Sequence, residues 1–442
     1  MNPHHRYLAA ACGLWLSVSG CRCGMTGPAV GAPPAALAVA DRPALLATLA
    51  AEAEREFFFA ERGGAVAWVD QEGGASRVVL SGRAGKAYAA VGQIALSPDG
   101  RRSAHAALAD GSWRMVVDGV EGKGYAELQG PVFSPDGTHL AYQARAGEAW
   151  HLVVDGTVSG PSRTPYQGPE FSADSSRIAF IADTDDRGFG RLVVSDLAFG
   201  SPQVVEPLAA DLRSSDDRSG IAAIAASGQK GRALAVAFDR PDRARRGPVY
   251  DAIWTPVLGR GGAPLAYLAE RGGQRLAVLD EQEEPLQAGE VFGHPVIRPG
   301  RKALGLIMLS GGSVVLHQAF AQGEKDGAPV ESAESLSWSG DGNTFAYVAQ
   351  RKDRWFLVAG GREGPTFDRA VAPRFSPDGR LLVYRARQDG KRFVVVADAT
   401  GKTVRQHPAY QQVFQPQFTA DGRSVAYGVK DGPQLRWVVE PL

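Results

Sequence analysis

The stretch that decides the fold runs from Phe133 to Gly156 and reads FSPDGTHLAYQARAGEAWHLVVDG. A second copy, FSPDGRLLVYRARQDGKRFVVVAD, runs from Phe375 to Asp398. Weaker copies appear when the chain is aligned on the serine of the SPDG tetrapeptide. The ten aligned positions are Ala60, Ser97, Ser134, Ser172, Ser215, Gly259, Arg298, Ser339, Ser376 and Thr419. A period of about 40 residues with several short strand-like runs per unit is typical of β-propeller blades.

Each copy contains two apolar runs separated by turn residues. In the copy at Ser134 the runs are 140–142 (LAY) and 150–154 (WHLVV). Their aromatic and β-branched residues favour a pleated, half-buried strand. The SPDG tetrapeptide supplies turn chemistry, because proline presets φ, aspartate bonds back to the main chain and glycine tolerates positive φ. One aromatic recurs at the same place in most copies, and we expect it to pack between sheets: Trp68, Tyr142, Phe180, Tyr267, Tyr347, Tyr384 and Tyr427.

The repeats predict an all-β propeller of about ten four-stranded units over residues 57–442. Ten units exceed the usual four to eight blades of one ring. The even spacing shows no linker inside the array, so we favour a single large ring. The alternative is two smaller rings that meet near residues 247–258.

Composition limits the range of partners. The chain has 442 residues with 48 basic and 48 acidic side chains, so its formal net charge is zero. A neutral chain has no global field that recruits nucleic acid. We therefore expect no nucleic-acid partner.

The N-terminus indicates export and lipidation. A short apolar run, 7–18, follows His4, His5 and Arg6 and is too short to span a bilayer. It ends in VSGC at 18–21, which resembles a bacterial lipobox. The prediction is a signal peptide over 1–20 and lipidation of Cys21, with an ordinary signal peptide as the alternative. Cys23 has no assigned role.

Two short segments precede the repeats. Residues 21–41 are small and proline-rich, which predicts a lipidated N-terminus followed by a flexible tether. Residues 42–56 contain mostly helix formers, so a short helix is favoured there. The alternative is a closing segment, because the last repeat ends after its third strand and residues 45–50 could supply the fourth.

The FSPDG-xx-LAY and LVVDG units resemble the WD-like propeller repeats of the TolB type. The resemblance covers most of the chain and implies a binding or scaffold protein of the bacterial cell envelope. Its expected partners are an envelope protein, peptide or polymer, together with the membrane reached through the N-terminal lipid. Arg22, rather than aspartate, follows the lipidated cysteine, which by resemblance to lipoprotein sorting favours the outer membrane facing the periplasm.

The search for chemistry predicts no catalytic residue, metal site or cofactor. Residues 160–164 (GPSRT) lack the second glycine of a nucleophile elbow. Residues 401–403 (GKT) lack the first glycine of a phosphate loop. The histidines are scattered without metal-ligand spacing. We expect a non-enzymatic protein, and the alternative is a lyase or hydrolase with its site in the propeller channel.

The loops between second and third strands differ most from copy to copy and carry charged side chains. The SPDG turns are nearly uniform, as expected of a scaffold. We therefore predict a partner-binding surface on the variable loops, where arginines are preferred hot-spot residues. Its predicted residues are Asp185, Asp186, Arg351, Arg354, Arg387 and Lys391.

Overall fold

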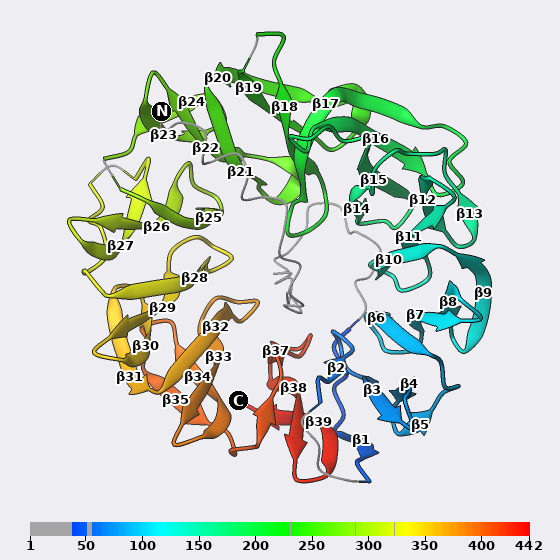
Figure 1. Ribbon diagram of the computed structural model, residues 1–442. Helices are drawn as coiled ribbons and strands as arrows, with labels where there is room; N and C mark the ends of the chain where they lie inside the picture. The colour runs from blue at the N-terminus through cyan, green and yellow to red at the C-terminus, as the bar shows by residue number, and fades with distance from the viewer. Residues whose placement is uncertain (1–37, 51–54, 230, 288, 322) are drawn as a thin grey trace.

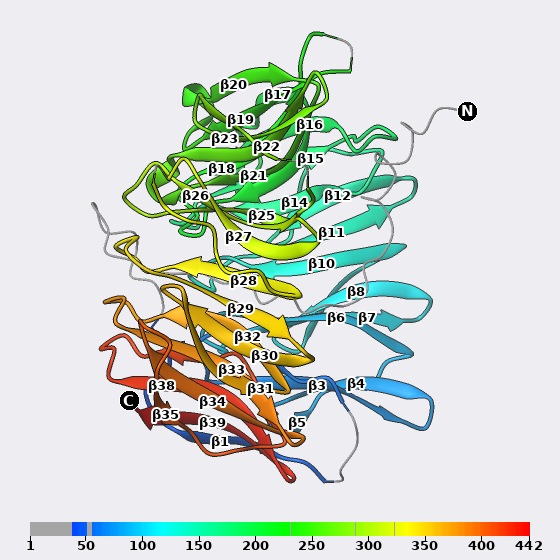
Figure 2. The ribbon, with the colours of Figure 1, turned by 90° about the vertical axis from the view of Figure 1, so that its left-hand side faces the viewer.

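The computed structural model describes residues 38–442 apart from 51–54, 230, 288 and 322. The predicted signal peptide, Cys21 and most of the predicted tether lie outside these residues. The described chain is a single ring of ten blades around a central channel (Figure 1). Seen edge-on, the strands of successive blades stack on one another and run from one face of the ring to the other (Figure 2). The predicted all-β propeller and its single ring are confirmed.

Blades 1 to 5 each begin with a strand next to the channel and proceed outward (Figure 1). Their strands are β2 (Phe58–Phe59), β3 (Val66–Glu72), β4 (Ala75–Leu80) and β5 (Arg83–Ala84) in blade 1; β6 (Ala90–Leu96), β7 (Ser103–Ala109), β8 (Ser112–Val117) and β9 (Val120–Tyr125) in blade 2; β10 (Glu127–Phe133), β11 (Leu140–Ala146), β12 (Ala149–Val154) and β13 (Thr157–Val158) in blade 3; β14 (Gln167–Phe171), β15 (Arg177–Ala182) and β16 (Gly190–Asp196) in blade 4; and β18 (Ile221–Ala226), β19 (Ala233–Phe238) and β20 (Arg245–Tyr250) in blade 5. The long strand β17 (Gln203–Ser214) belongs to both blade 4 and blade 5 and joins them in one sheet.

Blades 6 to 10 complete the ring. Their strands are β21 (Ala252–Leu258), β22 (Leu265–Arg271), β23 (Gln274–Leu279) and β24 (Gln282–Pro285) in blade 6; β25 (Val291–Ile297), β26 (Leu304–Ser310) and β27 (Ser313–Ala319) in blade 7; β28 (Ser332–Trp338), β29 (Phe345–Arg351), β30 (Arg354–Ala359) and β31 (Arg362–Phe367) in blade 8; β32 (Arg369–Phe375), β33 (Leu381–Gln388), β34 (Lys391–Asp398) and β35 (Thr403–Gln406) in blade 9; and β36 (Gln412–Val413), β37 (Gln417–Phe418), β38 (Ser424–Asp431), β39 (Gln434–Pro441) and β1 (Ala44–Thr48) in blade 10. Two 3₁₀ turns, Pro241–Arg243 and Arg260–Gly262, are the helical elements of the described chain. No helix within the described ranges is long and apolar enough to cross a membrane.

The helix favoured over 42–56 is wrong for the part that the structure describes. Strand β1 pairs antiparallel with β39, so Ala44 lies opposite Trp437 and Thr48 opposite Gln434. The closing-segment alternative is the one that forms (Figure 1). The reason is that the free edge of β39 offers backbone donors and acceptors, and pairing with them outweighs the weak helix propensity of so short a segment.

The SPDG motif is a self-bonded turn. Ser376 is buried, and its hydroxyl donates to Asp378 Oδ1 at 2.6 Å. The Ser376 hydroxyl oxygen also accepts the backbone N–H of Leu381 at 2.9 Å. Gly379 has φ +72° and returns its N–H to the Ser376 carbonyl at 2.9 Å. The copy at Ser134 has the same arrangement. The repeat therefore encodes the turn that joins the first two strands of a blade.

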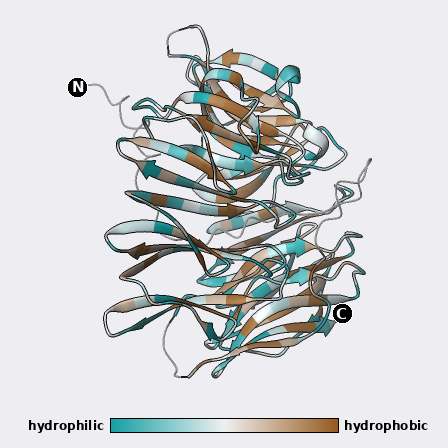
Figure 3. Cartoon of the chain, turned by 90° about the vertical axis from the view of Figure 1, so that its right-hand side faces the viewer, coloured by the Kyte–Doolittle hydropathy of each residue, from teal (hydrophilic) through white to brown (hydrophobic). Residues whose placement is uncertain are grey.

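Apolar and polar residues alternate along the strands (Figure 3). The buried apolar side chains of neighbouring blades pack against one another. The seven recurring aromatics from Trp68 to Tyr427 are all buried, which confirms their predicted place between sheets. Neighbouring blades are also joined by a repeated hydrogen bond that the motif did not reveal. Tyr250 donates to Glu283 Oε1 at 2.7 Å, and Tyr88 donates to Glu121 Oε1 at 3.1 Å with the same sequence separation of 33 residues.

Candidate functional site

The ring has two faces that its turns define. The SPDG turns lie on one face, here called the SPDG face. The turns between the second and third strands of each blade lie on the opposite face, here called the hairpin face. All six residues of the predicted partner-binding surface lie in or next to the turns of the hairpin face.

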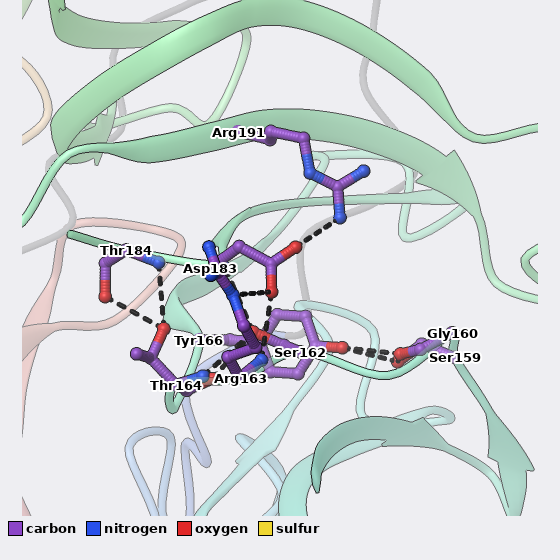
Figure 4. A network of polar contacts seen from close by, with 9 residues as sticks. All are labelled: Ser159, Gly160, Ser162, Arg163, Thr164, Tyr166, Asp183, Thr184 and Arg191. Carbon is purple, nitrogen blue, oxygen red and sulfur yellow. Dashed lines mark hydrogen bonds and ion pairs between the residues drawn. The ribbon is translucent and has the colours of Figure 1, made fainter.

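The loop between β15 and β16 is held by a polar network before any partner is present (Figure 4). Asp183 Oδ1 accepts the backbone N–H of Arg163 at 2.9 Å, and its other oxygen accepts a hydrogen bond from Arg191. Thr184 donates its backbone N–H and its hydroxyl to Thr164 Oγ1 at 2.8 and 2.9 Å. The backbone that presents the next two aspartates is therefore fixed.

The two predicted aspartates of this loop differ in what their carboxylates do. Asp185 is used within the loop, where it accepts the backbone N–H of Phe189 at 3.0 Å and the Arg187 guanidinium at 2.9 Å. Burial alone would raise the pKa of Asp185, but these hydrogen bonds hold it below its ordinary value. Asp186 is exposed and lines the central channel. Of the two, Asp186 is the carboxylate that is presented to solvent.

The predicted arginines of blade 8 are already engaged. Arg351 forms two hydrogen bonds of 2.9 Å with Glu363, in the same arrangement that Arg271 and Glu283 adopt in blade 6. Its recurrence in another blade indicates that this ion pair supports the blade itself. The prediction of Arg351 as a contact residue is therefore the weakest of the six.

The remaining predicted residues meet at the boundary between blades 8 and 9. Arg354 pairs with Asp368 and donates to Gln388 Oε1 of blade 9 at 2.7 Å. Arg387 and Lys391 are exposed on the β33–β34 hairpin that carries Gln388. A groove of about 490 Å³ lies at this boundary and is lined by Arg354 and Lys391 among others. The structure thus brings the blade 8 and blade 9 residues together, whereas Asp185 and Asp186 lie in blade 4, across the ring (Figure 1).

The central channel is the second candidate site. It encloses a cavity of about 3240 Å³ lined by residues of blades 1 to 7, which is well above the roughly 300–1,000 Å³ of common small-molecule pockets. Several of its charged side chains pair with each other, as in Arg55–Asp70 at 2.9 Å and Arg213–Asp211 at 2.8 Å. Within the described ranges, no group of three or more His, Cys, Asp or Glu residues is placed to hold a metal ion.

Some charged neighbours of the predicted residues were missed from the sequence. Arg369 and Arg392 lie on the strands that flank Arg387, and Lys430 lies in the next blade. The available signal was positional, because aligning the repeats sets these side chains at corresponding places in adjacent strands. The comparison of loops alone did not use this information.

Comparisons with known proteins support the fold and leave the function open. No family model matches the chain, and no curated protein matches it. Among solved structures, a eukaryotic initiation factor is 12% identical with a TM-score of 0.41, covering 80% of this chain and 88% of that one. An oligogalacturonate lyase in complex with manganese is 14% identical with a TM-score of 0.35, covering 79% and 98%.

TolB from Acinetobacter baumannii is also among the similar structures. It is 16% identical with a TM-score of 0.25, covering 62% of this chain and 64% of that one. The propeller class of the chain thus rests on its own sheets and ring, with propellers among its structural neighbours. Similarities at these values carry no argument about ligand or activity.

Proposed function

We propose that this chain is a non-enzymatic, lipid-anchored binding or scaffold protein of the bacterial cell envelope. It would be attached through Cys21, at the outer membrane facing the periplasm, and would hold an envelope protein, peptide or polymer on its hairpin face. A rigid ring that presents unequal charged loops on one face suits recognition.

The observation that supports this proposal most is the position of Ala40 on the ring. Ala40 donates its N–H to the carbonyl of Arg62, in the turn of blade 1 that corresponds to SPDG, at 2.7 Å. The Trp437 indole N–H donates to the Ala40 carbonyl at 3.0 Å. The chain therefore enters the ring at the SPDG face. We infer that the lipid anchor lies on the side of this face and that the hairpin face is open to a partner.

The anchoring is tested by replacing Cys21 with Ala. The variant should be released as soluble protein or accumulate as unprocessed precursor, and labelled fatty acid should be incorporated only into the wild-type chain. Stable attachment requires two lipid signals, so loss of acylation should remove the protein from membranes. A Cys21→Ala protein that is processed normally and remains in the membrane fraction contradicts the proposal.

The choice of face is tested by photo-crosslinking in intact cells. A photoreactive residue at Lys391, on the hairpin face, should give a discrete adduct, and one at Arg101, on the SPDG face, should not. Alanine at the exposed residues Asp186, Arg387 and Lys391 should weaken the adduct while the free energy of unfolding changes by less than about 0.5 kcal/mol each. An adduct confined to Arg101 would assign the partner to the other face.

A further inference from the structure

The hairpin end of blade 9 carries a lateral row of three arginines. Antiparallel pairing sets Arg369 of β32 opposite Arg387 of β33, and Arg387 opposite Arg392 of β34. Like charges that lie directly opposite on adjacent strands destabilise a sheet. Folding of the blade alone therefore does not account for this row.

In other blades, the residues at the same positions across the strands are not all basic. They are Glu127–Arg145–Trp150 in blade 3, Ala252–Glu270–Arg275 in blade 6 and Ser332–Gln350–Trp355 in blade 8. In blade 3 the cation has a carboxylate partner, because Arg145 Nε lies 3.4 Å from Glu127 Oε2. The row of blade 9 departs from the pattern of the repeat towards positive charge.

The first arginine of the row is neutralised by the neighbouring blade. Arg369 Nη2 donates to Glu334 Oε1 at 2.6 Å, and its guanidinium lies 3.7 Å from the centre of the Trp355 ring. This side chain thus combines an ion pair with a cation–π contact. Arg369 is fully engaged and adds little to the charge that solvent meets.

The third arginine shares a neutral partner with a lysine of blade 10. Arg392 Nη1 donates to the main-chain oxygen of Gln411 at 2.6 Å, and Lys430 Nζ donates to the side-chain oxygen of the same residue at 2.6 Å. Lys430 is only 9% exposed. A cation that is taken out of water is normally offset by a counter-ion. Gln411 is uncharged, and neither the buried Lys430 nor the exposed Arg392 forms an ion pair with a residue that the structure describes.

Between these groups the hairpin tip presents two more cations. Arg387 and Lys391 are exposed, and neither forms an ion pair with a described residue. The carboxylate of the tip is Asp389, whose Oδ1 accepts Gln388 Nε2 at 3.3 Å. A second carboxylate, Asp368, accepts the backbone N–H of Asp389 at 2.7 Å and is paired with Arg354. Four cations, Arg387, Lys391, Arg392 and Lys430, thus gather around this hairpin tip. We call this group the blade 9 cationic cluster.

The cluster adjoins the groove between blades 8 and 9. Lys391 lines this groove together with other polar residues, among them Asp389, and the rings of Phe367 and Phe393 add an apolar part to its lining. Gln388 and Lys391 pair across the hairpin and lie on the side of blade 8, where Gln388 accepts a hydrogen bond from Arg354 and Lys391 lines the groove. Arg387 and Arg392 form the next pair, which lies on the other side of the strands, and Arg392 bonds to Gln411 there. The tip therefore offers positive charge on both sides and, on one of them, a groove with a partly apolar lining.

We propose that the blade 9 cationic cluster binds an acidic segment of a partner protein, with an apolar side chain of that segment in the adjoining groove. This rests on the proposed function and names the chemistry of its partner. A segment fits better than one small anion, because the cations are spread over β33, β34 and β38. Carboxylates match guanidinium donors by paired hydrogen bonds. A membrane surface is disfavoured because the chain enters the ring at the opposite face.

The test uses the full chain in detergent and a fluorescent peptide of alternating Asp and Glu around a single Phe. The peptide should bind, with an affinity that falls as salt is raised. The variant Arg387→Glu/Lys391→Glu/Arg392→Glu should bind at least ~10-fold more weakly, since each lost charge-assisted contact adds to the effect. The matched control reverses three exposed arginines of the SPDG face, Arg101, Arg380 and Arg423, and should bind as the wild type does.

Several outcomes overturn the proposal. One is that the acidic peptide does not bind, and another is that the control variant loses as much affinity for it as the blade 9 variant does. A third is that a peptide with Lys in place of Asp and Glu binds as tightly as the acidic peptide. The last is that the protein binds phosphatidylglycerol vesicles or inorganic phosphate in preference to the peptide. Failure of membrane anchoring is detected separately by the Cys21→Ala fractionation and leaves this result unaffected.

A milder variant separates binding from folding. Arg387→Gln removes the central charge of the row, which the strand register sets opposite Arg369 and Arg392, so its stability should equal or exceed that of the wild type. It should still bind the peptide several-fold more weakly. A residue that supports folding alone would show the reverse, with lower stability and unchanged binding, and that result also overturns the proposal.

Discussion

Ring closure by β1 predicts that Leu49 contributes strongly to the stability of the whole propeller. Leu49 follows β1, donates its N–H to the Pro433 carbonyl at 2.7 Å and is only 4% exposed. Its side chain belongs to an apolar cluster that includes Trp68 of blade 1 and Leu435 of blade 10. Leu49→Ala should therefore remove about 2–5 kcal/mol from the free energy of unfolding, as for other buried leucines.

Leu45 provides the matched control on the same segment. Its side chain is 59% exposed, so Leu45→Ala should change the free energy of unfolding by less than about 0.5 kcal/mol. Urea unfolding followed by tryptophan fluorescence measures both variants, and Trp68 and Trp437 lie close enough to report on closure. The midpoint of Leu49→Ala should fall while the slope of the transition stays the same.

Two results would refute this reasoning. If Leu49→Ala and Leu45→Ala have equal stability, the apolar contacts of the closing segment do not hold the ring. If Leu49→Ala loses only the protease resistance of the N-terminal segment, while the main transition is unchanged, then β1 detaches without cost to the other blades.

Two further predictions concern contacts between and within blades. Burial alone would raise the pKa of Glu440, but hydrogen bonds from His407 and Tyr427 bring this pKa below its ordinary value of 4.5. The ionised carboxylate therefore stabilises the fold above pH 4.5. This contribution is lost as the pH falls through the pKa of the folded state. Urea unfolding of Glu440→Gln between neutral pH and pH 4 should show a weaker loss of stability on acidification than the wild type, and parallel curves would contradict the assignment. Tyr250→Phe removes the hydrogen bond to Glu283 and should cost about 1–2 kcal/mol in thermal or urea unfolding, whereas an unchanged midpoint would show that Arg271 alone satisfies this carboxylate.

The architecture was predictable because the repeat combines two local signals. The SPDG turn bonds to itself through side chains such as Ser376 and Asp378, so the blades that carry this motif form the turn from local contacts. The apolar runs on either side have the alternation that a strand requires. The closing strand was less predictable, because the residues of β1 favour a helix when considered alone. Their partner, β39, lies at the far end of the chain, and local propensity does not include it.

The candidate surface was predictable in place but not in detail. Variable loops on one face pointed to the hairpin face, where Arg354, Arg387 and Lys391 do meet. The sequence did not distinguish Arg351, whose charge is used within blade 8, from Arg387, whose charge is not. Such a difference depends on which carboxylate each side chain reaches after the strands pair, and only the register of neighbouring strands fixes that.

The pairing of Thr48 with Gln434 has a consequence for how the protein is made. Strand β1 is synthesised long before its partner β39, so blade 10 is incomplete until β39 has also been made. Closing a loop of this length has a high entropic cost and slows the final step of folding. A chain truncated before β39 would keep β1 as an unpaired edge, ready to pair with another molecule. Completion of the ring therefore distinguishes chains that contain both β1 and β39 from fragments that lack either strand.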